Sequence, residues 1–562
     1  MNDVSVLVSS EDSIQIQFPQ KICGEINERI TDFVENLKTY TCDVPEIIEI
    51  VPTYCAVTVY FNPDEIRQDF VLKLIGEVIE KTDKGASSSK KGGKLVEIPV
   101  CYEDEEFAPD LADVSKHTGL SKEEIIALHS SKDYLIYMLG FLPGFPYLGG
   151  MDERLETPRL ESPRTKIPAG SVAIGGKQAG LYPSDSPGGW RIIGRTPLKV
   201  FDQERNPACL YEAGDSIRFV PVSREEFDRI AEKQNSSSDS KIPGQGKNDI
   251  QSSSFLQRYV CTGGIKILEG GMCTTVQDKG RFGFQHLGIG QGGVMDIESY
   301  QAGNKILGND ENAACLEATL LAPTIQFTSG CDFVITGGIC SAVLDEKPVQ
   351  MNQKYHAEKG SVLKCGFVTK GLRSYLCFKG GILVPELFGS RSTNLKSKSG
   401  GYFGRKLEAG DELAIGDFSC KKGIGENPAP IESNSIEENE VLVLFCTKGS
   451  QYSSFSEEAV RKFQESVFTV LPESDRMGIR FSGQSLECGK TDIISDAIPF
   501  GSVQITSSGL PVVMASDRQT TGGYAKIAAV TRKSMCALAQ ALPGTKVKFT
   551  IKSNSGLGPE SF

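Results

Sequence analysis

Residues that could act on a small molecule gather on turns rich in glycine and proline in the first half of the chain. The stretch GFLPGFPYLGG, residues 140–150, combines four glycines and two prolines with three aromatic rings. His129 precedes it, and Arg164 and a second glycine-rich loop ending at Trp190, the only tryptophan, follow it. Glycines let backbone amides approach a ligand, rings supply apolar walls, and arginine binds carboxylate or phosphate through paired hydrogen bonds. This combination favours a small-molecule pocket over a tight turn whose rings merely fill a core.

His129 is the candidate acid or base of that pocket, because the reference pKa of histidine, about 6.5, lies near working pH. A histidine before an apolar strand is more often structural, so a core role is the alternative. Arg164 is expected to hold a carboxylate or phosphoryl oxygen.

A second set of polar residues recurs along the second half of the chain. The dipeptide Asp-Arg occurs twice, at 475–476 and 517–518, and the second copy opens the run DRQTTGGY. Exposed ion pairs contribute little to stability, so each dipeptide alone is consistent with an ordinary surface. The run is nevertheless too polar for a core strand and too structured for a linker. We expect a second anion site with the cationic residues Arg281, His286, Arg476 and Arg518 and the hydrogen-bonding residues Gln277, Gln504 and Gln519.

Composition argues against several classes of function. The net charge of −12 disfavours nucleic-acid binding, which depends on cationic side chains that release counterions. The sixteen cysteines include no CxxC pair and only four histidines occur, so we expect no metal site built by the protein. Isolated cysteines in apolar surroundings indicate a reducing compartment. The sequence shows no signal-peptide pattern and no apolar run of membrane-spanning length, so we expect a cytoplasmic protein without a membrane partner.

The elements that must position these residues fall into two modules. Residues 235–254 have the composition of a flexible linker between them. In the first module, 1–95 is predicted to be a small α+β domain. Residues 96–234 are predicted to form a β-barrel domain, because short β-type runs alternate with glycine and proline. Residues 255–562 show the same alternation of short β-type runs with glycine and proline. The predicted fold class is therefore mainly β with a small N-terminal α/β region.

Hydrophobic periodicity also predicts individual elements. Strands are predicted at 13–18, 56–61, 333–336, 441–446 and 546–551. Helices are predicted at 25–37, 64–81, 109–128, 296–307 and 532–542. Ser121 with Glu124 has the pattern of a capping box inside the third of these helices.

Long motifs in both modules resemble one family. GFLPGFPYLGG and the later PRTKIPAGSVAIGGKQAGLYPSDSPGGWRIIGRTP resemble allophanate hydrolase subunit 1, also described as the B subunit of 5-oxoprolinase. VQDKGRFGFQHLGIGQGGVMDIESYQAGNKILGN, SDRMGIRFSG, ISDAIPFGSVQI and SDRQTTGGYAKIAAVTRK resemble allophanate hydrolase subunit 2, the C subunit of 5-oxoprolinase. The chain therefore resembles a B–C fusion. The resemblance implies cyclophilin-like β-barrel domains, one in 96–234 and two halves in 255–562, behind a small α/β domain.

The resemblance also implies three alternative functions. The first is a component of an ATP-dependent 5-oxoprolinase, which opens the cyclic amide 5-oxoproline to glutamate together with a LamB/YcsF-type A subunit and is inactive without it. The second is the carboxyltransferase part of a biotin-dependent urea or amide carboxylase. The third is a binding protein that regulates a histidine kinase. ATP is the expected cofactor, and Mg²⁺ follows from the ATP requirement alone. The chain lacks an Ala-Met-Lys-Met-type sequence, so no biotin is expected on it; whether it forms a homo-oligomer is left open.

Site residues are carried over from the resemblance by position. The catalytic candidates are His129, Arg164, His286 and Arg518. The substrate-binding candidates of the first module are Gly144, Phe145, Tyr147, Gln178, Tyr182, Ser186, Pro187, Gly188 and Trp190. Those of the second module are Gln277, Arg281, Met295, Asp296, Arg391, Arg476, Gln504, Asp517, Gln519, Thr520 and Tyr524.

Overall fold

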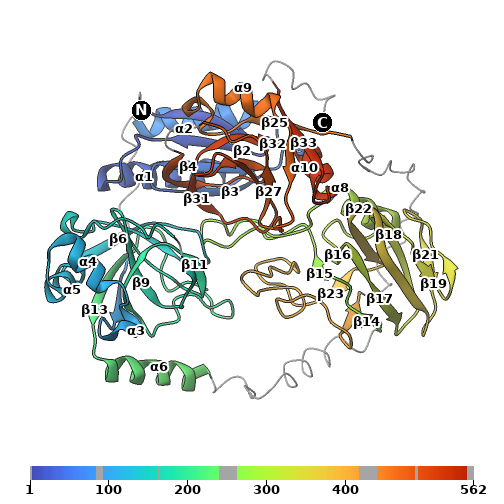
Figure 1. Ribbon diagram of the computed structural model, residues 1–562, viewed down its shortest axis with the longest axis horizontal. Coiled ribbons are helices and arrows are strands. Elements are labelled where there is room, and N and C mark those ends of the chain that lie inside the picture. Colours follow the sequence, from blue (N-terminus) through green and yellow to red (C-terminus); the bar gives the residue numbers. More distant parts are fainter. Residues whose placement is uncertain are drawn as a thin grey trace.

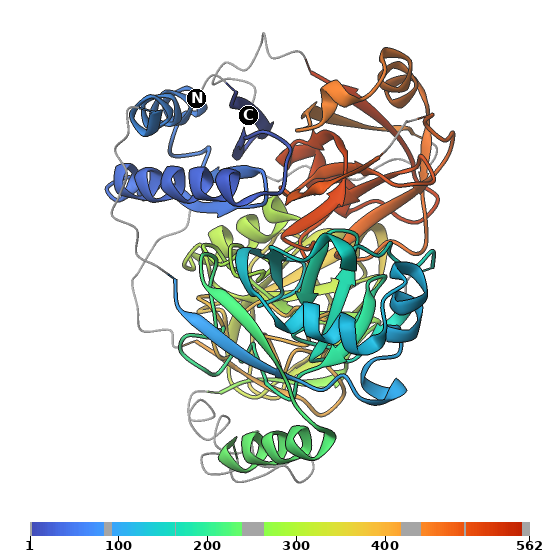
Figure 2. The same cartoon turned by 90° about the vertical axis from the view of Figure 1, so that its left-hand side faces the viewer.

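Strands dominate the architecture. The computed structural model describes residues 3–83, 93–162, 164–238, 263–416, 440–487 and 491–552. The described strands form four large sheets and two two-stranded ribbons. In Figure 1 the N-terminal sheet (blue) and the C-terminal barrel (red) lie together at the top, above a second sheet (cyan and green) on one side and the largest sheet (yellow) on the other. In Figure 2, which is turned by 90°, the N-terminal domain (blue) again lies beside the C-terminal barrel (red).

The N-terminal domain is a four-stranded sheet covered on one face by two helices. Its strand order is β1-β2-β4-β3. The helices are α1 (Gly24–Thr41) and α2 (Gln68–Asp83). The strands are β1 (Ser5–Ser10), β2 (Ser13–Gln17), β3 (Ile47–Pro52) and β4 (Ala56–Phe61). In the sequence SIQIQ of β2, Ile14 and Ile16 point into the core shared with the helices, as the alternation of apolar and polar residues requires.

The opposite, polar face of this sheet is buried against the second module. Gln15 is 1% exposed and Tyr60 is 6% exposed. The Gln15 amide donates a 3.1 Å hydrogen bond to Asp496, and the Glu49 carboxylate accepts a 2.9 Å bond from the backbone N–H of His286. Strand β1 also lies against β25 and β32 of the C-terminal barrel. A face whose pattern predicts contact with water therefore forms a contact between modules.

The first module continues into a seven-stranded sheet with the order β12-β9-β10-β7-β6-β13-β5. Its strands are β5 (Leu95–Val100), β6 (Asp133–Leu139), β7 (Pro146–Gly149), β9 (Ser171–Gly175), β10 (Gln178–Leu181), β12 (Arg191–Arg195) and β13 (Ser216–Pro221). A ribbon pairs β8 (Arg164–Ile167) with β11 (Ser186–Gly188). The helices are α3 (Asp104–Phe107), α4 (Leu111–Thr118), α5 (Lys122–Ser130), α6 (Arg224–Ser238) and the 3₁₀ turn η1 (Glu153–Leu155).

The second module contains the largest sheet, with eleven strands, and a closed barrel. The large sheet comprises β14 (Gly264–Glu269), β15 (Cys273–Gln277), β16 (Cys315–Thr319), β17 (Leu321–Phe327), β18 (Cys331–Cys340), β19 (Val343–Leu344), β20 (Lys347–Pro348), β21 (Tyr355–Ala357), β22 (Val362–Phe378), β23 (Ile382–Leu383) and β24 (Glu412–Ile415). The barrel comprises β25 (Leu442–Lys448), β26 (Phe468–Val470), β27 (Gly478–Ser482), β29 (Ser502–Ile505), β30 (Pro511–Met514), β32 (Lys526–Val530) and β33 (Lys546–Ile551). A ribbon beside it pairs β28 (Asp492–Ala497) with β31 (Thr521–Tyr524). The helices are α8 (Ile297–Leu307), α9 (Glu457–Glu465), α10 (Arg532–Ala539) and the 3₁₀ turn η3 (Tyr452–Ser454).

Most predicted elements are present. The prediction of a mainly β chain with barrel-type sheets and a small N-terminal α/β region is confirmed. The helix predicted at 109–128 is wrong in one respect: it is two helices, α4 and α5, because Gly119 ends the first with φ +76°. The capping box of Ser121 and Glu124 then starts the second helix. Of the predicted linker, 235–238 are the last residues of α6 and the remainder lies outside the described residues.

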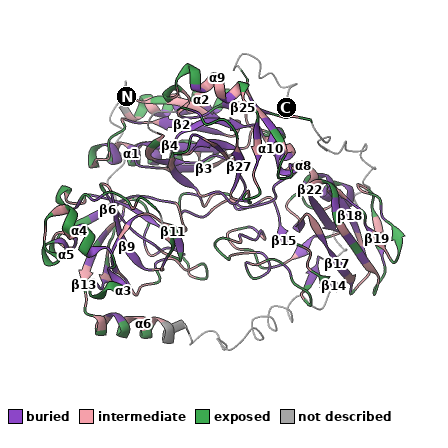
Figure 3. Ribbon diagram, viewed as in Figure 1, coloured by how far each residue is buried: buried purple, intermediate pink, exposed green. Residues whose placement is uncertain are grey.

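Each sheet has its own buried core, shown in purple in Figure 3. The interior of the C-terminal barrel includes Phe463, Phe468 and Phe549, and the first barrel-like sheet encloses a separate core around Ile136 and Ile174. Within the ranges that the structure describes, no helix is both long and apolar enough to cross a bilayer.

The contact between modules generates the first prediction. We expect the two modules to stay together after the chain is cut at a protease site inserted between residues 239 and 262, because the polar sheet face is matched by hydrogen bonds across the contact. Co-elution of the two fragments in size-exclusion chromatography checks this. Glu49→Ala should weaken the association about tenfold or more, since bonds to a carboxylate contribute about 1.5–3 kcal/mol each. Asp69→Ala, on the exposed side of the same domain, is the control. Fragments that are folded yet separate at micromolar concentration would contradict the prediction.

Candidate functional site

The aromatic residues expected to meet do meet, in one cluster beside β7, β10 and β12. The ring centre of Phe145 lies 5.0 Å from that of Tyr147, 5.1 Å from that of Tyr182 and 5.6 Å from that of Trp190. All four side chains are buried. A Cβ atom at Gly180 would approach both Phe145 and Trp190 to 2.9 Å, so glycine at this position lets the rings close. We name Phe145, Tyr147, Tyr182 and Trp190 the aromatic cluster.

The glycine-rich loop that carries these rings also forms a contact with the second module. The backbone N–H of Phe141 donates a 3.1 Å bond to the Thr521 hydroxyl, and that of Gly144 donates a 2.9 Å bond to the Leu287 carbonyl. A Cβ atom at Gly140 would overlap the Thr521 side chain. The loop is therefore stiff and glycine-rich for two reasons. Its rings build the cluster, and its backbone fits closely against another module.

His129 does not lie in this cluster, and its predicted role as an acid or base is wrong. The ring is completely buried at the end of α5, stacked on Phe219 at 4.4 Å, with Nδ1 2.8 Å from the Tyr102 hydroxyl. Burial lowers the pKa of His129 to about 3, so the completely buried ring is neutral at working pH. The structural alternative weighed from the sequence is the correct one.

Arg164 is likewise occupied by the protein itself. Its guanidinium donates two hydrogen bonds of 2.7 and 2.8 Å to the carboxylate of Asp110, just before α4. The same carboxylate accepts a 2.7 Å bond from the backbone N–H of Ile192. This bidentate pair ties α4 to β8 and β12, and it uses the Nη1/Nη2 edge of the Arg164 guanidinium for a carboxylate of the protein. The expectation that Arg164 holds substrate is not supported by its contacts.

A buried ion network holds the two sheets of the second module together. Arg476 donates bonds of 3.0 and 3.1 Å to Asp517, a further bond to Glu317, and a 2.5 Å bond to the Gly293 carbonyl. Glu317 in turn accepts a 2.8 Å bond from the backbone N–H of Met295. The predicted residues Arg476, Asp517 and Met295 thus meet. They are saturated with protein partners, as a structural network is.

A second buried network fixes the loops around Asp278. This carboxylate accepts hydrogen bonds from the hydroxyls of Ser390 (2.7 Å) and Ser392 (2.6 Å) and from the backbone N–H of Arg391 (2.5 Å). Arg281 donates to the Ser392 carbonyl, and burial lowers the pKa of its guanidinium.

The remaining predicted residues of this region are also held by the protein. The Gln277 amide donates a 3.0 Å bond to the Thr393 carbonyl, the Arg391 guanidinium pairs with Glu386 at 2.8 Å, and Asp296 caps the N-terminus of α8. These side chains therefore shape the loops and do not present free donors.

Arg518 differs from Arg164, Arg391 and Arg476, which form ion pairs. It is 3% exposed, and its guanidinium has no carboxylate within ion-pair distance among the described residues. Its Nε donates a 2.8 Å bond to the Ile498 carbonyl and Nη2 a 3.2 Å bond to the Gln291 side chain, whereas Nη1 has no partner. The Phe500 ring lies 5.5 Å from the guanidinium carbon. Burial lowers the pKa of Arg518, and the weaker opposing influence of Tyr60 and Asp12 does not offset it.

Further unsatisfied polar groups lie on β4, on β29 and near Arg518 in the chain. The Tyr60 and Thr58 hydroxyls of β4, the Gln504 amide nitrogen and the Thr520 hydroxyl are all buried without a hydrogen-bond partner among the described residues. Tyr60 is in electrostatic contact with Arg518, and Gln504 and Gln519 both lie 3.5 Å from the position of a Cβ atom at Gly522. We name Tyr60, Gln504, Arg518 and Thr520 the interface site. Unpaired buried donors around a cation are what an anionic ligand would satisfy.

His286 lies at the edge of the interface site but is held by Glu49. Its Nδ1 lies 2.9 Å from the Glu49 carboxylate, which also accepts a 3.3 Å bond from Gln285. The imidazole is 43% exposed, so it remains accessible. Five of the predicted residues therefore gather at or beside the interface site: His286, Gln504, Arg518, Gln519 and Thr520.

Several residues near this site were not singled out in the sequence. They are Gln15, Thr58 and Tyr60 of the N-terminal sheet, and Asp496 and Lys526 of the second module. The buried Lys526 pairs with Asp496, which also accepts bonds from Gln15 (3.1 Å) and Gln451 (2.9 Å). The alternation in β2 and β4 could have indicated them. It places polar residues on the face of the sheet that α1 and α2 do not cover.

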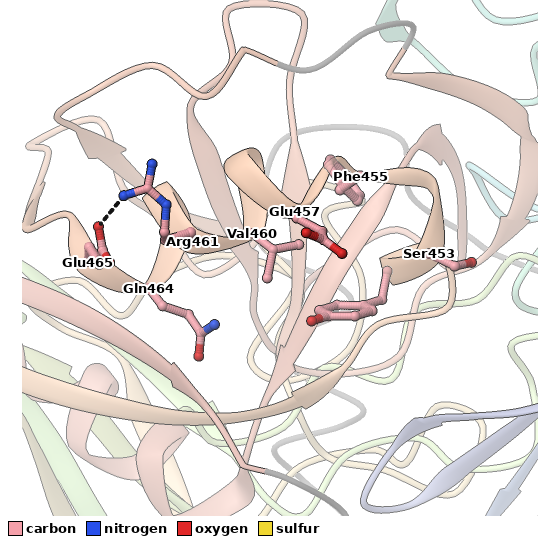
Figure 4. Close-up of a pocket in the computed structure, with 8 residues that line it drawn as sticks. Ser453, Phe455, Glu457, Val460, Arg461, Gln464 and Glu465 are labelled. Carbon is pink, nitrogen blue, oxygen red and sulfur yellow. Dashed lines mark hydrogen bonds and ion pairs between the residues drawn. The ribbon is translucent and has the colours of Figure 1, made fainter.

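Other predicted residues lie apart from the interface site. Gln178, Ser186, Pro187 and Gly188 belong to β10 and β11 of the first module, and Tyr524, 38% exposed, lies at the end of β31. A surface hollow of about 400 Å³ on η3 and α9, lined by Tyr452, Phe455 and Arg461 among others, contains none of the predicted residues (Figure 4). No group of three or more His, Cys, Asp or Glu side chains that could hold a metal occurs in the described ranges.

Comparison with known proteins assigns both modules to one family. A family model described as "Carboxyltransferase domain, subdomain C and D" matches residues 4–211, and one described as "Carboxyltransferase domain, subdomain A and B" matches 287–551. The chain is similar to the C subunit of 5-oxoprolinase from Haemophilus influenzae, with 38% identity over 291 residues (51% of this chain and 91% of that protein). It is also similar to the B subunit of 5-oxoprolinase from Bacillus subtilis, with 40% identity over 220 residues (38% of this chain and 91% of that protein).

Two further similarities concern the whole chain and a longer protein. The crystal structure of TTHA0988 superimposes with a TM-score of 0.79 at 28% identity, covering 96% of this chain and 99% of that one. Urea amidolyase of Lachancea kluyveri is 31% identical over 305 residues, which are 51% of this chain but 17% of that protein.

The buried state of His129 predicts a pH dependence of stability. Its pKa falls from about 6.5 in the unfolded chain to about 3 in the folded one, so unfolding takes up a proton below pH 6.5. This contribution to stability is full above pH 6.5 and is lost progressively as the pH falls toward 3. Between pH 7 and 5 it should remove about 2 kcal/mol, at up to about 1.36 kcal/mol per pH unit. Urea unfolding of the wild type and of His129→Phe at both pH values checks this. If the free energy of unfolding of His129→Phe falls as much between pH 7 and 5 as that of the wild type, the prediction is wrong.

Arg476 and Arg518 make a matched pair for a second stability prediction. Arg476→Met leaves Asp517 and Glu317 buried without their cation and should reduce the free energy of unfolding by about 3–5 kcal/mol. Arg518→Met removes a buried charge that has no carboxylate partner and should leave the free energy of unfolding unchanged or raise it. Thermal and urea unfolding of the two variants measures both changes. A comparable loss of unfolding free energy in the two variants would show that Arg518 is structural.

Proposed function

The chain belongs to the carboxyltransferase-domain family that includes the B and C subunits of 5-oxoprolinase, and on that premise we propose that it is the combined B and C component of an ATP-dependent 5-oxoprolinase. Relatives named as the B and the C subunits match its first and second modules, an arrangement consistent with a B–C fusion. The observation that carries the proposal is the interface site, where a buried, uncompensated Arg518 meets unsatisfied donors from both modules.

The proposed substrate, 5-oxoproline, presents a carboxylate and a lactam. In our proposal Arg518 binds the carboxylate, since a guanidinium in a buried site forms strong charge-assisted hydrogen bonds with it. The Tyr60 hydroxyl and the Gln504 amide donate to the remaining oxygens, which satisfies groups that have no partner in the protein. The ring then lies against Phe500, which flanks the guanidinium.

The energetics of the reaction require a co-substrate and a partner. A five-membered lactam is resonance-stabilised, and ATP hydrolysis supplies the driving force for opening it. The described residues show neither a nucleotide-binding loop nor a metal cluster, and we therefore propose that the enzyme is completed by a LamB/YcsF-type A subunit. In this scheme the present chain positions the substrate anion.

A second candidate is a carboxyltransferase for urea or a related amide. The match to carboxyltransferase-domain models and the similarity to urea amidolyase favour it. It requires carboxybiotin from another chain, and its substrate, urea, carries no carboxylate for Arg518. The unpaired arginine therefore favours the oxoprolinase proposal.

The test is reconstitution with purified components. We expect glutamate release coupled to ADP formation only when the chain, a LamB/YcsF-type partner, ATP, Mg²⁺ and 5-oxoproline are all present. Arg518→Met should lower kcat/KM about 10- to 100-fold, the value of one charge-assisted hydrogen bond or more. Arg480→Met, which changes an exposed arginine of the same barrel, is the matched control. A folded, partner-bound chain that shows no dependence on 5-oxoproline would refute the proposal, and carboxyl transfer from carboxybiotin to urea would establish the second candidate.

A further inference from the structure

Arg159 is an exposed arginine of the first module that lacks an acidic partner. It follows η1, and no carboxylate lies within ion-pair distance of it among the described residues. Its neighbours on the same domain behave differently. Arg154 pairs with Asp152 at 2.9 Å, Arg191 with Asp113 at 2.9 Å and Arg218 with Asp133 at 2.7 Å. Arg195 and Arg205 of the same domain also form no ion pair among the described residues, but they donate to backbone carbonyl oxygens, whereas the hydrogen bond found there for Arg159 is to the Gln178 side chain.

The Arg159 side chain faces the aromatic cluster. Its guanidinium carbon lies 5.7 Å from the Trp190 ring, and Nη2 approaches the Gln178 side-chain oxygen at 3.4 Å, a weak contact. The guanidinium is also in electrostatic contact with the hydroxyls of Tyr147 and Tyr182. Most of its hydrogen-bonding capacity is left unused by the protein, since a guanidinium has five N–H donors.

A buried hydroxyl from another domain lies beside this arginine. Tyr54, in the turn between β3 and β4, is 1% exposed and packs edge-on against Tyr137 at 5.5 Å and Tyr147 at 5.8 Å. Its hydroxyl is buried and makes no hydrogen bond of regular geometry among the described residues, although the Gln178 side chain lies within reach of it. Burial raises the pKa of Tyr54 well above its usual value, while Gln178 and Arg159 act in the opposite direction because they lie next to it.

We propose that Arg159, Gln178 and the Tyr54 hydroxyl form a second anion-binding site, which takes the carboxylate or phosphate oxygens of a small ligand against the Trp190 ring. The guanidinium and the tyrosine O–H are donors without strong partners, and an oxyanion accepts from both. None of these residues belongs to the interface site. The proposal also stands apart from the proposed function, since it requires neither ATP nor a partner protein.

The single tryptophan makes the test direct, because all tryptophan fluorescence of the chain comes from Trp190. The full-length chain is titrated with 5-oxoproline, with inorganic phosphate and with 2-pyrrolidinone, which has the lactam ring but no anionic group. We expect a saturable change of Trp190 emission with at least one of the two anions and none with 2-pyrrolidinone. The anion that saturates at the lower concentration identifies the ligand class.

Variants assign the response to this site. Arg159→Gln, at an exposed position that does not endanger folding, should raise the Kd at least tenfold, whereas Arg154→Gln, on the neighbouring η1, should leave it unchanged. Tyr54→Phe should raise the Kd several-fold with an unchanged unfolding temperature, because it removes one hydroxyl without a partner. Arg518→Met should retain the response, which separates this site from the interface site. The absence of a saturable change with either anion, or an equal Kd in Arg159→Gln, would overturn the proposal.

Discussion

The burial of a polar sheet face is the constraint on which the arrangement of the modules depends. Strands β2, β3 and β4 turn their apolar residues toward α1 and α2, and the polar residues that remain are covered by the second module and not by water. Burying such groups costs free energy unless they are hydrogen-bonded. Gln15 and Glu49 are satisfied by Asp496 and by the segment 285–286, which fixes one docking position. The hydroxyls of Thr58 and Tyr60 have no partner among the described residues, and Tyr60 is the one that our proposal assigns to the ligand.

The buried cations of the second module differ in whether a carboxylate of the protein lies in contact with them. Arg476 lies between two carboxylates, Lys526 pairs with Asp496, and Arg281 is in electrostatic contact with two acidic residues. The charges of Arg476 and Lys526 are neutralised by carboxylates in contact with them, whereas Arg281, like Arg518, forms no ion pair among the described residues. Arg518 has amide and carbonyl contacts only. A buried charge that the fold does not neutralise is costly to keep for stability alone, so its position argues for an external anion.

The sequence allowed the local structure to be predicted better than the long-range partners. Periodicity located α8 and β4, and the Ser121 capping box marked the start of α5, because these features depend on residues close together in the chain. His129 and Arg164 were misinterpreted because their roles are decided by Phe219 and Asp110, far away in sequence. Gly119 divided one predicted helix into two through its backbone conformation. The alternation in β2 and β4 indicated a polar face, but no local pattern reveals whether water or protein covers it.

The glycine-rich loop and the β3–β4 hairpin connect the two sites that remain open to ligands. The loop places its rings in the aromatic cluster and its backbone against Thr521, next to Thr520 of the interface site. The hairpin places Tyr54 in the first site and Tyr60 in the second, six positions apart on one rigid unit. A ligand that shifts either tyrosine must therefore move the hairpin against both modules. Fusion of the two modules in one chain keeps both surfaces at a high effective concentration around the small N-terminal domain. Each of the two proposed sites thus combines a tyrosine of this shared hairpin with donors from a different domain.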